Sequence, residues 1–158
     1  MQIDITIDAA VSVPPEKSFD YIVPVDLSHI FHRHLLIPGV QRTDEAQPWF
    51  TPGLARTVYF QDGSTAREEL LEVVPPKSFA YRITNFTGVN KLLLARIDGV
   101  WQFTRRDDGG TAIVWTYSLV PRNATSRVVI KLFVAPMIQT FLQRAIDIIK
   151  YDLEPAKS

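Results

Sequence analysis

The chain has 158 residues, of which 17 are basic and 17 acidic, and it contains no cysteine. This length suits one domain with a substantial core. The balanced charge does not gather in blocks, so the sequence gives no electrostatic footprint for nucleic acid or anionic lipid and favours an uncharged or amphipathic partner. The lack of cysteine excludes disulfides, thiolate metal sites and a cysteine nucleophile.

The beginning of the chain alternates apolar and acidic residues and has neither the basic flank nor the apolar centre of a signal peptide. No uninterrupted apolar run approaches the length that spans a bilayer. We therefore expect a cytoplasmic location and no transmembrane segment.

The first elements are a strand and two short helices. Alternation of apolar and polar residues from Ile3 to Val13 predicts a half-buried strand that ends at Pro14. Residues 16–23 read as a short helix, with proline at its start and an acidic first turn. A second short helix, residues 27–31, begins at Asp26 as its N-cap.

Six further strands follow, separated by turn residues. They are predicted over residues 40–46, 54–61, 65–74, 79–86, 95–105 and 111–120. The sequence Asp62-Gly63-Ser64 is a strong hairpin signal between two of them. Short connections of this kind predict antiparallel neighbours.

The last segment, Thr125 to about Leu153, is the only one with a sustained helical period. Its predicted apolar stripe consists of Phe133, Val134, Met137, Phe141, Ala145 and Ile148. Such a stripe needs a partner, and the preceding sheet is the only candidate of sufficient size. Pro136 removes a backbone donor inside the helix, so we expect a kink between Val134 and Pro136.

The order of these elements and their turn residues resembles the START-like, polyketide cyclase-like superfamily of helix-grip proteins. The residues that carry the resemblance are 14–21, 26–28 before 38–40, 52–53, 72–81, and 101–103 followed by 109–115. It implies an α+β helix-grip fold: a seven-stranded curved antiparallel sheet around a long C-terminal helix, with two short helices after the first strand. One ligand-binding domain would cover residues 1–154, before a disordered tail at residues 155–158. The superfamily includes lipid carriers, hormone receptors and aromatic cyclases, so the resemblance leaves the function open.

Strand parity predicts which side chains face the helix. In the last three strands the bulky residues occupy odd positions, whereas their even neighbours are polar or small. The predicted ligand-binding residues are Tyr81, Trp101, Phe103, Trp115 and Tyr117 from the strands, with Phe133, Met137 and Phe141 from the helix. The alternative is that these aromatic residues only fill the core.

Two charges in the strand 65–74 share the parity of apolar neighbours. If the alternation is regular, Arg67 and Glu69 point inward, where a buried pair or an arginine facing a ligand oxygen would be tolerated. The alternative is a bulge or a protruding strand that leaves both charges in solvent.

The three histidines, His29, His32 and His34, fall within six residues. Their spacing is irregular and no nearby carboxylate or thiolate cluster completes a set, so we expect no metal site. In the resembled superfamily this segment borders the cavity mouth, where a histidine could act as a general acid or base. The candidates for catalysis are His32, His34, Arg67, Glu69 and Tyr81.

The sequence contains neither a nucleophile elbow nor a glycine-rich nucleotide-binding loop, so we expect no cofactor. Three functions remain open for a monomer or homodimer. The first is binding of a small hydrophobic or amphipathic molecule such as a lipid, isoprenoid or polyketide-like aromatic. The second is a polyketide cyclase or dehydratase that uses the same cavity, and the third is a protein-interaction module with a closed core.

Overall fold

The structure, a computed structural model, describes residues 2–45 and 47–154. Its strands are β1 (Ile3–Val11), β2 (Val40–Thr43), β3 (Ala55–Phe60), β4 (Thr65–Val74), β5 (Ser78–Thr84), β6 (Leu94–Arg105) and β7 (Thr111–Pro121). They form one antiparallel sheet in the order β1-β7-β6-β5-β4-β3-β2. Ala46, the end of one predicted strand, and the predicted tail at 155–158 lie outside the described residues.

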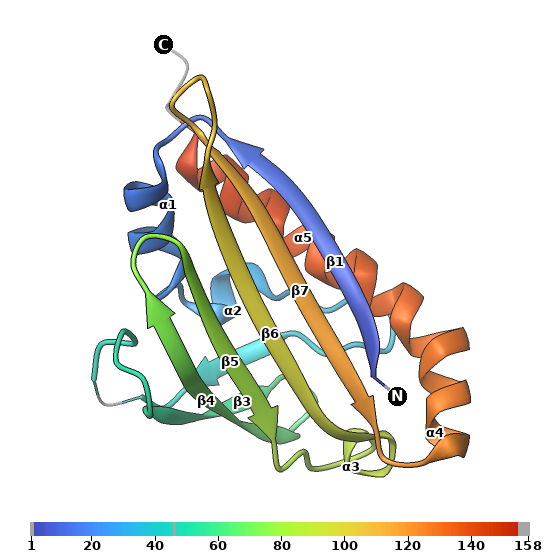
Figure 1. The fold of residues 1–158 in the computed structure, drawn as a ribbon. Coiled ribbons are helices and arrows are strands. Elements are labelled where there is room, and N and C mark those ends of the chain that lie inside the picture. Colours follow the sequence, from blue (N-terminus) through green and yellow to red (C-terminus); the bar gives the residue numbers. More distant parts are fainter. Residues whose placement is uncertain (1, 46, 155–158) are drawn as a thin grey trace.

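The first and last strands are neighbours, because β1 pairs with β7 along its whole length. The chain then leaves the sheet through α1 (Pro15–Ile22) and α2 (Leu27–Ile30) before it returns at β2. Asp26 accepts a hydrogen bond from the Ser28 amide at 3.0 Å, which confirms the predicted N-cap of the second helix. Both helices lie on the concave side of the sheet (Figure 1).

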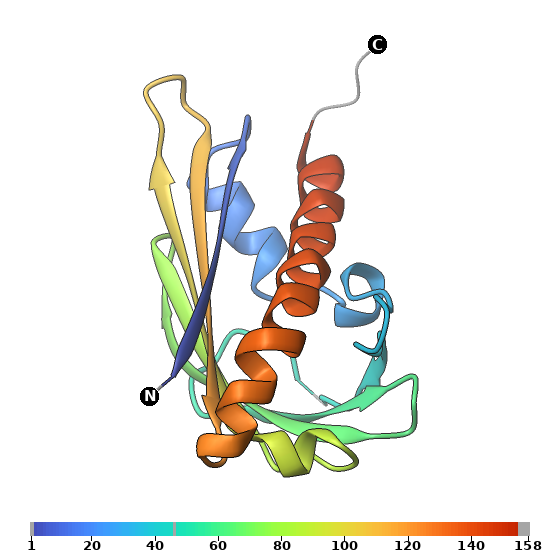
Figure 2. The ribbon, with the colours of Figure 1, turned by 90° about the vertical axis from the view of Figure 1, so that its right-hand side faces the viewer.

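The C-terminal helix lies across the same concave side (Figures 1 and 2), which confirms the helix-grip architecture. It has three parts: α4 (Ala124–Val129), the π-helical turn η1 (Ile130–Val134) and α5 (Ala135–Leu153). The Ala135 amide donates to the Ile130 carbonyl five residues earlier, and Pro136, which has no amide hydrogen, follows at once. Figure 2 shows the helix axis changing direction here, where the kink was predicted.

The wide turn changes which residues of the helix face the sheet. The fully covered residues are Ile130, Leu142, Ala145, Ile146 and Ile149, whereas Phe133 is 65% exposed and Met137 and Ile148 are only half-buried. The predicted stripe was therefore wrong at its N-terminal end. A π turn carries an extra residue, so a regular 3.6-residue period does not continue through it.

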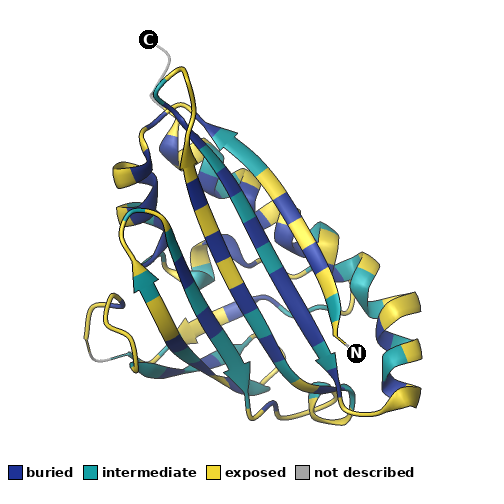
Figure 3. Cartoon of the chain, viewed as in Figure 1, coloured by how far each residue is buried: buried dark blue, intermediate teal, exposed yellow. Residues whose placement is uncertain are grey.

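One helical stretch, 124–153, is long and apolar enough to cross a bilayer by length and composition alone, a test that core helices also pass. In this fold its apolar face packs on the sheet. Figure 3 shows the matching alternation of buried and exposed residues along β6. The predicted odd-position residues of the last three strands are buried or half-buried, which confirms the parity argument.

A third short helix, α3 (Asn90–Leu93), was not predicted. It lies between β5 and β6 and begins two residues after Gly88, whose φ of 72° suits glycine. The Arg122 amide donates to the Leu93 carbonyl at 2.9 Å, and the Arg122 Nε donates to the Lys91 carbonyl at 2.8 Å. These bonds hold α3 against the start of α4.

Candidate ligand-binding cavity

A cavity lies between the sheet, the α1–α2 segment and α5. Its volume is about 70 Å³ for the centres of water-sized spheres. Its lining residues are Ile22, Val23, Val25, Leu27, Ile30, Phe31, Val40, Trp49, Arg56, Val58, Phe60, Glu68, Phe79, Tyr81, Ile83, Trp101, Trp115, Tyr117 and Phe141. The wall is thus mostly aromatic and aliphatic, with one basic and one acidic residue.

Five of the eight predicted ligand-binding residues line this cavity: Tyr81, Trp101, Trp115, Tyr117 and Phe141. The other three do not. Phe103 is buried farther along β6, where it packs against Phe19 with ring centroids 5.6 Å apart. Phe133 and Met137 lie outside the lining because of the π turn.

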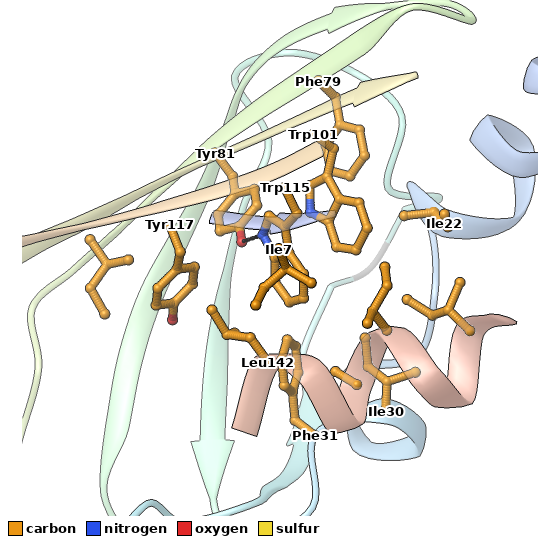
Figure 4. Packing of buried hydrophobic residues seen from close by; sticks show 14 of the residues in the cluster. Ile7, Ile22, Ile30, Phe31, Phe79, Tyr81, Trp101, Trp115, Tyr117 and Leu142 are labelled. Carbon is orange, nitrogen blue, oxygen red and sulfur yellow. Dashed lines mark hydrogen bonds between the residues drawn. The ribbon is translucent and has the colours of Figure 1, made fainter. Parts of the chain in front are cut away.

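The aromatic wall is ordered by stacking and by one hydrogen bond. The rings of Trp101 and Trp115 stack with centroids 4.2 Å apart, and the Trp115 Nε1 donates to the Tyr81 hydroxyl at 3.0 Å (Figure 4). A Cβ on Gly99 would lie 2.1 Å from the Tyr81 ring, so the ring has its place only because position 99 has no side chain. Across the cavity, Phe31 stacks on Phe141 at 5.2 Å.

An ion pair is built into the wall where β3 meets β4. Arg56 and Glu68 stand opposite each other in the sheet, and the Arg56 Nε donates to the Glu68 Oε1 at 2.6 Å. The Arg56 Nη1 also donates to the Glu45 Oε1 at 2.8 Å, and its guanidinium lies 4.0 Å from the centre of the Trp49 ring. Arg56 is therefore held on three sides by two carboxylates and an indole.

Burial dominates the electrostatics of this wall. It raises the pKa of the Glu68 carboxyl more than the Arg56 charge lowers it. It likewise raises the pKa values of Tyr81 and Tyr117, to which the nearby Glu68 charge contributes. The Tyr81 and Tyr117 hydroxyls are therefore protonated and can donate hydrogen bonds to a ligand oxygen.

Arg56 and Glu68 were not among the predicted site residues, although the sequence contains a signal for them. The hairpin at Asp62-Gly63-Ser64 was predicted, and its register places Arg56 opposite Glu68 and Val58 opposite Ala66. Aligning the two strands of the hairpin would have placed these two opposite charges side by side on the buried face.

Arg67 and Glu69 lie on the other face of β4. Arg67 is exposed and Glu69 is half-buried, so the solvated alternative holds. The register shifts between Leu70 and Glu72, which is the predicted kind of irregularity. The prediction that Arg67 and Glu69 point inward was wrong. It relied on Leu71 and Val73, which lie beyond the bulge, where the alternation of inward and outward residues is shifted by one position.

The histidines also lie outside the cavity lining. His29 Nε2 is 2.7 Å from the Asp152 Oδ2, and His32 Nε2 is 2.7 Å from the His29 carbonyl. His34 pairs through its backbone with Ile37. Within residues 2–45 and 47–154, no group of three or more histidine and acidic side chains is arranged to hold a metal ion. Among the five predicted catalytic candidates, only Tyr81 faces the cavity.

The sequence model of the family described as polyketide cyclase/dehydrase and lipid transport matches residues 2–154. The chain belongs to this family. The match covers nearly the whole chain, so the resemblance stated from the sequence is confirmed. This family supports hydrophobic ligand binding or cyclase activity in general and specifies no ligand.

Solved structures share the fold at low sequence identity. The crystal structure of Ara h 8.0201 matches with a TM-score of 0.65 and 18% identity, over 97% of this chain and 98% of that one. The di-domain ARO/CYC BexL from the BE-7585A biosynthetic pathway matches with a TM-score of 0.67 and 18% identity, over 99% of this chain but 51% of that chain. CV1439 from Chromobacterium violaceum matches with a TM-score of 0.67 and 15% identity, over 97% and 98% of the two chains. Among curated proteins none matches significantly.

Proposed function

We propose that this protein binds a small apolar or amphipathic molecule that carries an oxygen function. The observation behind the proposal is the composition of the wall: stacked aromatic and aliphatic side chains, interrupted by the buried pair Arg56–Glu68. An apolar body would pack on Trp101 and Trp115. Its oxygen would point to the Tyr117 hydroxyl and to Glu68.

Binding requires the cavity to open. A volume of about 70 Å³ holds a few water molecules, whereas pockets for drug-sized ligands measure roughly 300–1,000 Å³. The stacked rings of Phe31, which directly follows α2, and of Phe141 in α5 both lie outside the sheet. Separation of this pair would enlarge the space without breaking the sheet.

Native mass spectrometry of freshly purified protein would identify a co-purified ligand, and titration with a fluorescent apolar probe would measure binding. The larger ring of Ile83→Trp fills the cavity at its half-exposed end. The probe then loses apolar contact area inside the cavity, so we expect its affinity to fall at least about tenfold. Val100→Trp places the same ring on the outer face of the neighbouring strand and should bind as the parent does. Equal probe affinity in a folded Ile83→Trp variant would contradict the cavity assignment.

A cyclase or dehydratase is the second candidate, favoured by the convergence of Glu68, Tyr81 and Tyr117 in one wall. A buried carboxyl beside two phenols can move a proton to or from a polyketide carbonyl, while Arg56 keeps Glu68 in place. Incubation with linear polyketides should then give cyclised products, and Glu68→Gln should abolish turnover while the variant still binds. Binding without turnover in the parent protein would leave only the carrier function.

The third function, a closed interaction module, predicts a different result in the same assays. The protein would then carry no ligand in native mass spectra and would not take up the probe at all.

A further inference from the structure

Three segments far apart in the sequence present large apolar side chains to solvent at one end of the fold. They are the loop 33–37 between α2 and β2, the segment around α3, and α4 with η1. Their exposed apolar residues are Leu35, Leu36, Val89, Leu92, Val128, Leu132 and Phe133, with exposed fractions from 54% to 82%. Exposed large apolar side chains in such number are typical of an interaction site. Figure 2 faces this side of the molecule.

The same segments are basic. The stretches 27–43, 85–97 and 122–146 contain no aspartate or glutamate. The cations nearest the exposed apolar residues in the chain are Arg33, Lys91, Arg122, Arg127 and Lys131. Over residues 2–45 and 47–154, none of these five forms an ion pair with a carboxylate. Asp62 belongs to the hairpin beside the 33–37 loop, where it accepts hydrogen bonds from Ser64.

The fold brings these segments together next to the cavity. Hydrogen bonds from Arg122 to the Leu93 and Lys91 carbonyls fix α3 to α4. The segment that precedes the loop 33–37 packs on α5, where the Phe31 and Phe141 rings stack with centroids 5.2 Å apart. Two half-exposed cavity residues border this end: Ile83 comes just before the α3 segment, and Phe60 begins the β3–β4 hairpin. We call the surface made by these three segments the apolar–basic surface.

We propose that the apolar–basic surface docks on the face of an anionic phospholipid bilayer. Unpaired lysine and arginine side chains among exposed leucine, valine and phenylalanine match a bilayer interface, where phosphates lie above acyl chains. The surface borders the cavity, so docking would present the cavity end at Ile83 and Phe60 to the lipid.

The test is co-sedimentation of the full chain with phosphatidylcholine vesicles that contain or lack phosphatidylserine. We expect binding only when phosphatidylserine is present, and weaker binding as salt is raised. The triple variant Lys91→Glu, Arg127→Glu, Lys131→Glu should bind at least about tenfold more weakly. A matched control reverses three exposed cations elsewhere, Lys17→Glu, Lys77→Glu and Arg106→Glu, and should bind like the parent.

A second pair of variants tests the apolar part. Leu132→Ser with Phe133→Ser should also lose binding, whereas Leu71→Ser with Val100→Ser, on other exposed positions, should not. The substituted residues of these variants are exposed, apart from the half-buried Arg127 of the charge variant, so circular dichroism should show folded protein. No binding to anionic vesicles, or full binding by either surface variant, would overturn the proposal.

One further outcome would point to another occupant. A concentration-dependent dimer that the Leu132→Ser, Phe133→Ser variant abolishes, without any vesicle binding, would show that a second copy of the chain covers the surface. The cavity-filling variant Ile83→Trp should still bind vesicles, so failure of ligand binding and failure of membrane docking can be told apart.

Discussion

At the scale of single residues, the Arg56–Glu68 pair is the least expected part of the wall. A buried ion pair is costly to desolvate, and its attraction compensates only when the geometry is good and further partners are present. Arg56 has such partners in Glu45 and Trp49. Apolar residues of similar volume would serve a purely structural wall equally well, so the pair favours the proposed ligand-binding function.

Replacing one residue of the Arg56–Glu68 pair should destabilise the fold more than replacing both. Arg56→Ala leaves the Glu68 carboxyl buried without its cation, so we expect a loss of about 3–5 kcal/mol in the free energy of unfolding, measured by urea denaturation. Arg56→Leu combined with Glu68→Leu should recover most of this loss. The exposed pair Arg105–Glu16 provides the comparison, because Arg105→Ala should lower the free energy of unfolding far less. Equal losses at the two sites would contradict the burial argument.

Gly99 should be sensitive for a steric reason. Gly99→Ala places a methyl group against the Tyr81 ring, which its hydrogen bond with Trp115 holds in place, so we expect a destabilisation of about 1–3 kcal/mol in thermal unfolding. Tyr81→Leu in the same chain should reduce that cost, since the ring is then absent. If the two changes were simply additive, the ring contact would not be the cause.

At the scale of elements, three helices meet at Asp152. The carboxylate at the end of α5 accepts a hydrogen bond from the Tyr21 hydroxyl of α1 and lies 2.7 Å from His29 of α2. The two short helices close one side of the cavity, so this contact connects the cavity wall to the end of the long helix. Tyr21 and His29 hold the pKa of Asp152 below its ordinary value.

The lowered pKa gives a pH dependence with a definite sign. Asp152 binds a proton less readily in the folded chain, so its contribution is complete above its unfolded pKa of about 3.9 and is lost as the pH falls through its lower folded value. Asp152→Asn should therefore reduce the parent's acid-induced loss of stability below about pH 4, measured as unfolding midpoints across pH. An identical pH profile in the variant would show that the contact contributes nothing.

Across the fold, the sequence predicted correctly which residues are buried wherever this depends only on the regular repeat of a single strand or helix. The odd-position residues Trp101, Trp115 and Tyr117 are buried because a strand alternates with a period of two and those strands carry no irregularity near them. The helix followed its expected period only after Pro136, because the π turn at 130–134 breaks the phase. Phe133 was lost from the predicted wall for that reason.

Features that depend on contacts between distant segments could not be predicted from the pattern of any one segment. The pair Arg56–Glu68 needs the register of two strands, and the apolar–basic surface needs three stretches that are separated by strands. A neutral chain without charge blocks thus predicted no attraction to anionic lipid, whereas the proposed apolar–basic surface takes its cations from stretches that contain no acidic residue.

The pairing of β1 with β7 has a consequence for how the protein forms during synthesis. Val11 pairs with Thr111, 100 residues later, and Ile3 pairs with Leu119. At about 5–20 residues per second on the ribosome, the first strand waits roughly 5–20 s before its partner exists. Throughout that time its alternating apolar face, from Ile5 to Val11, has neither a neighbouring strand nor the long helix to cover it, so the strand is open to non-native pairing in that interval.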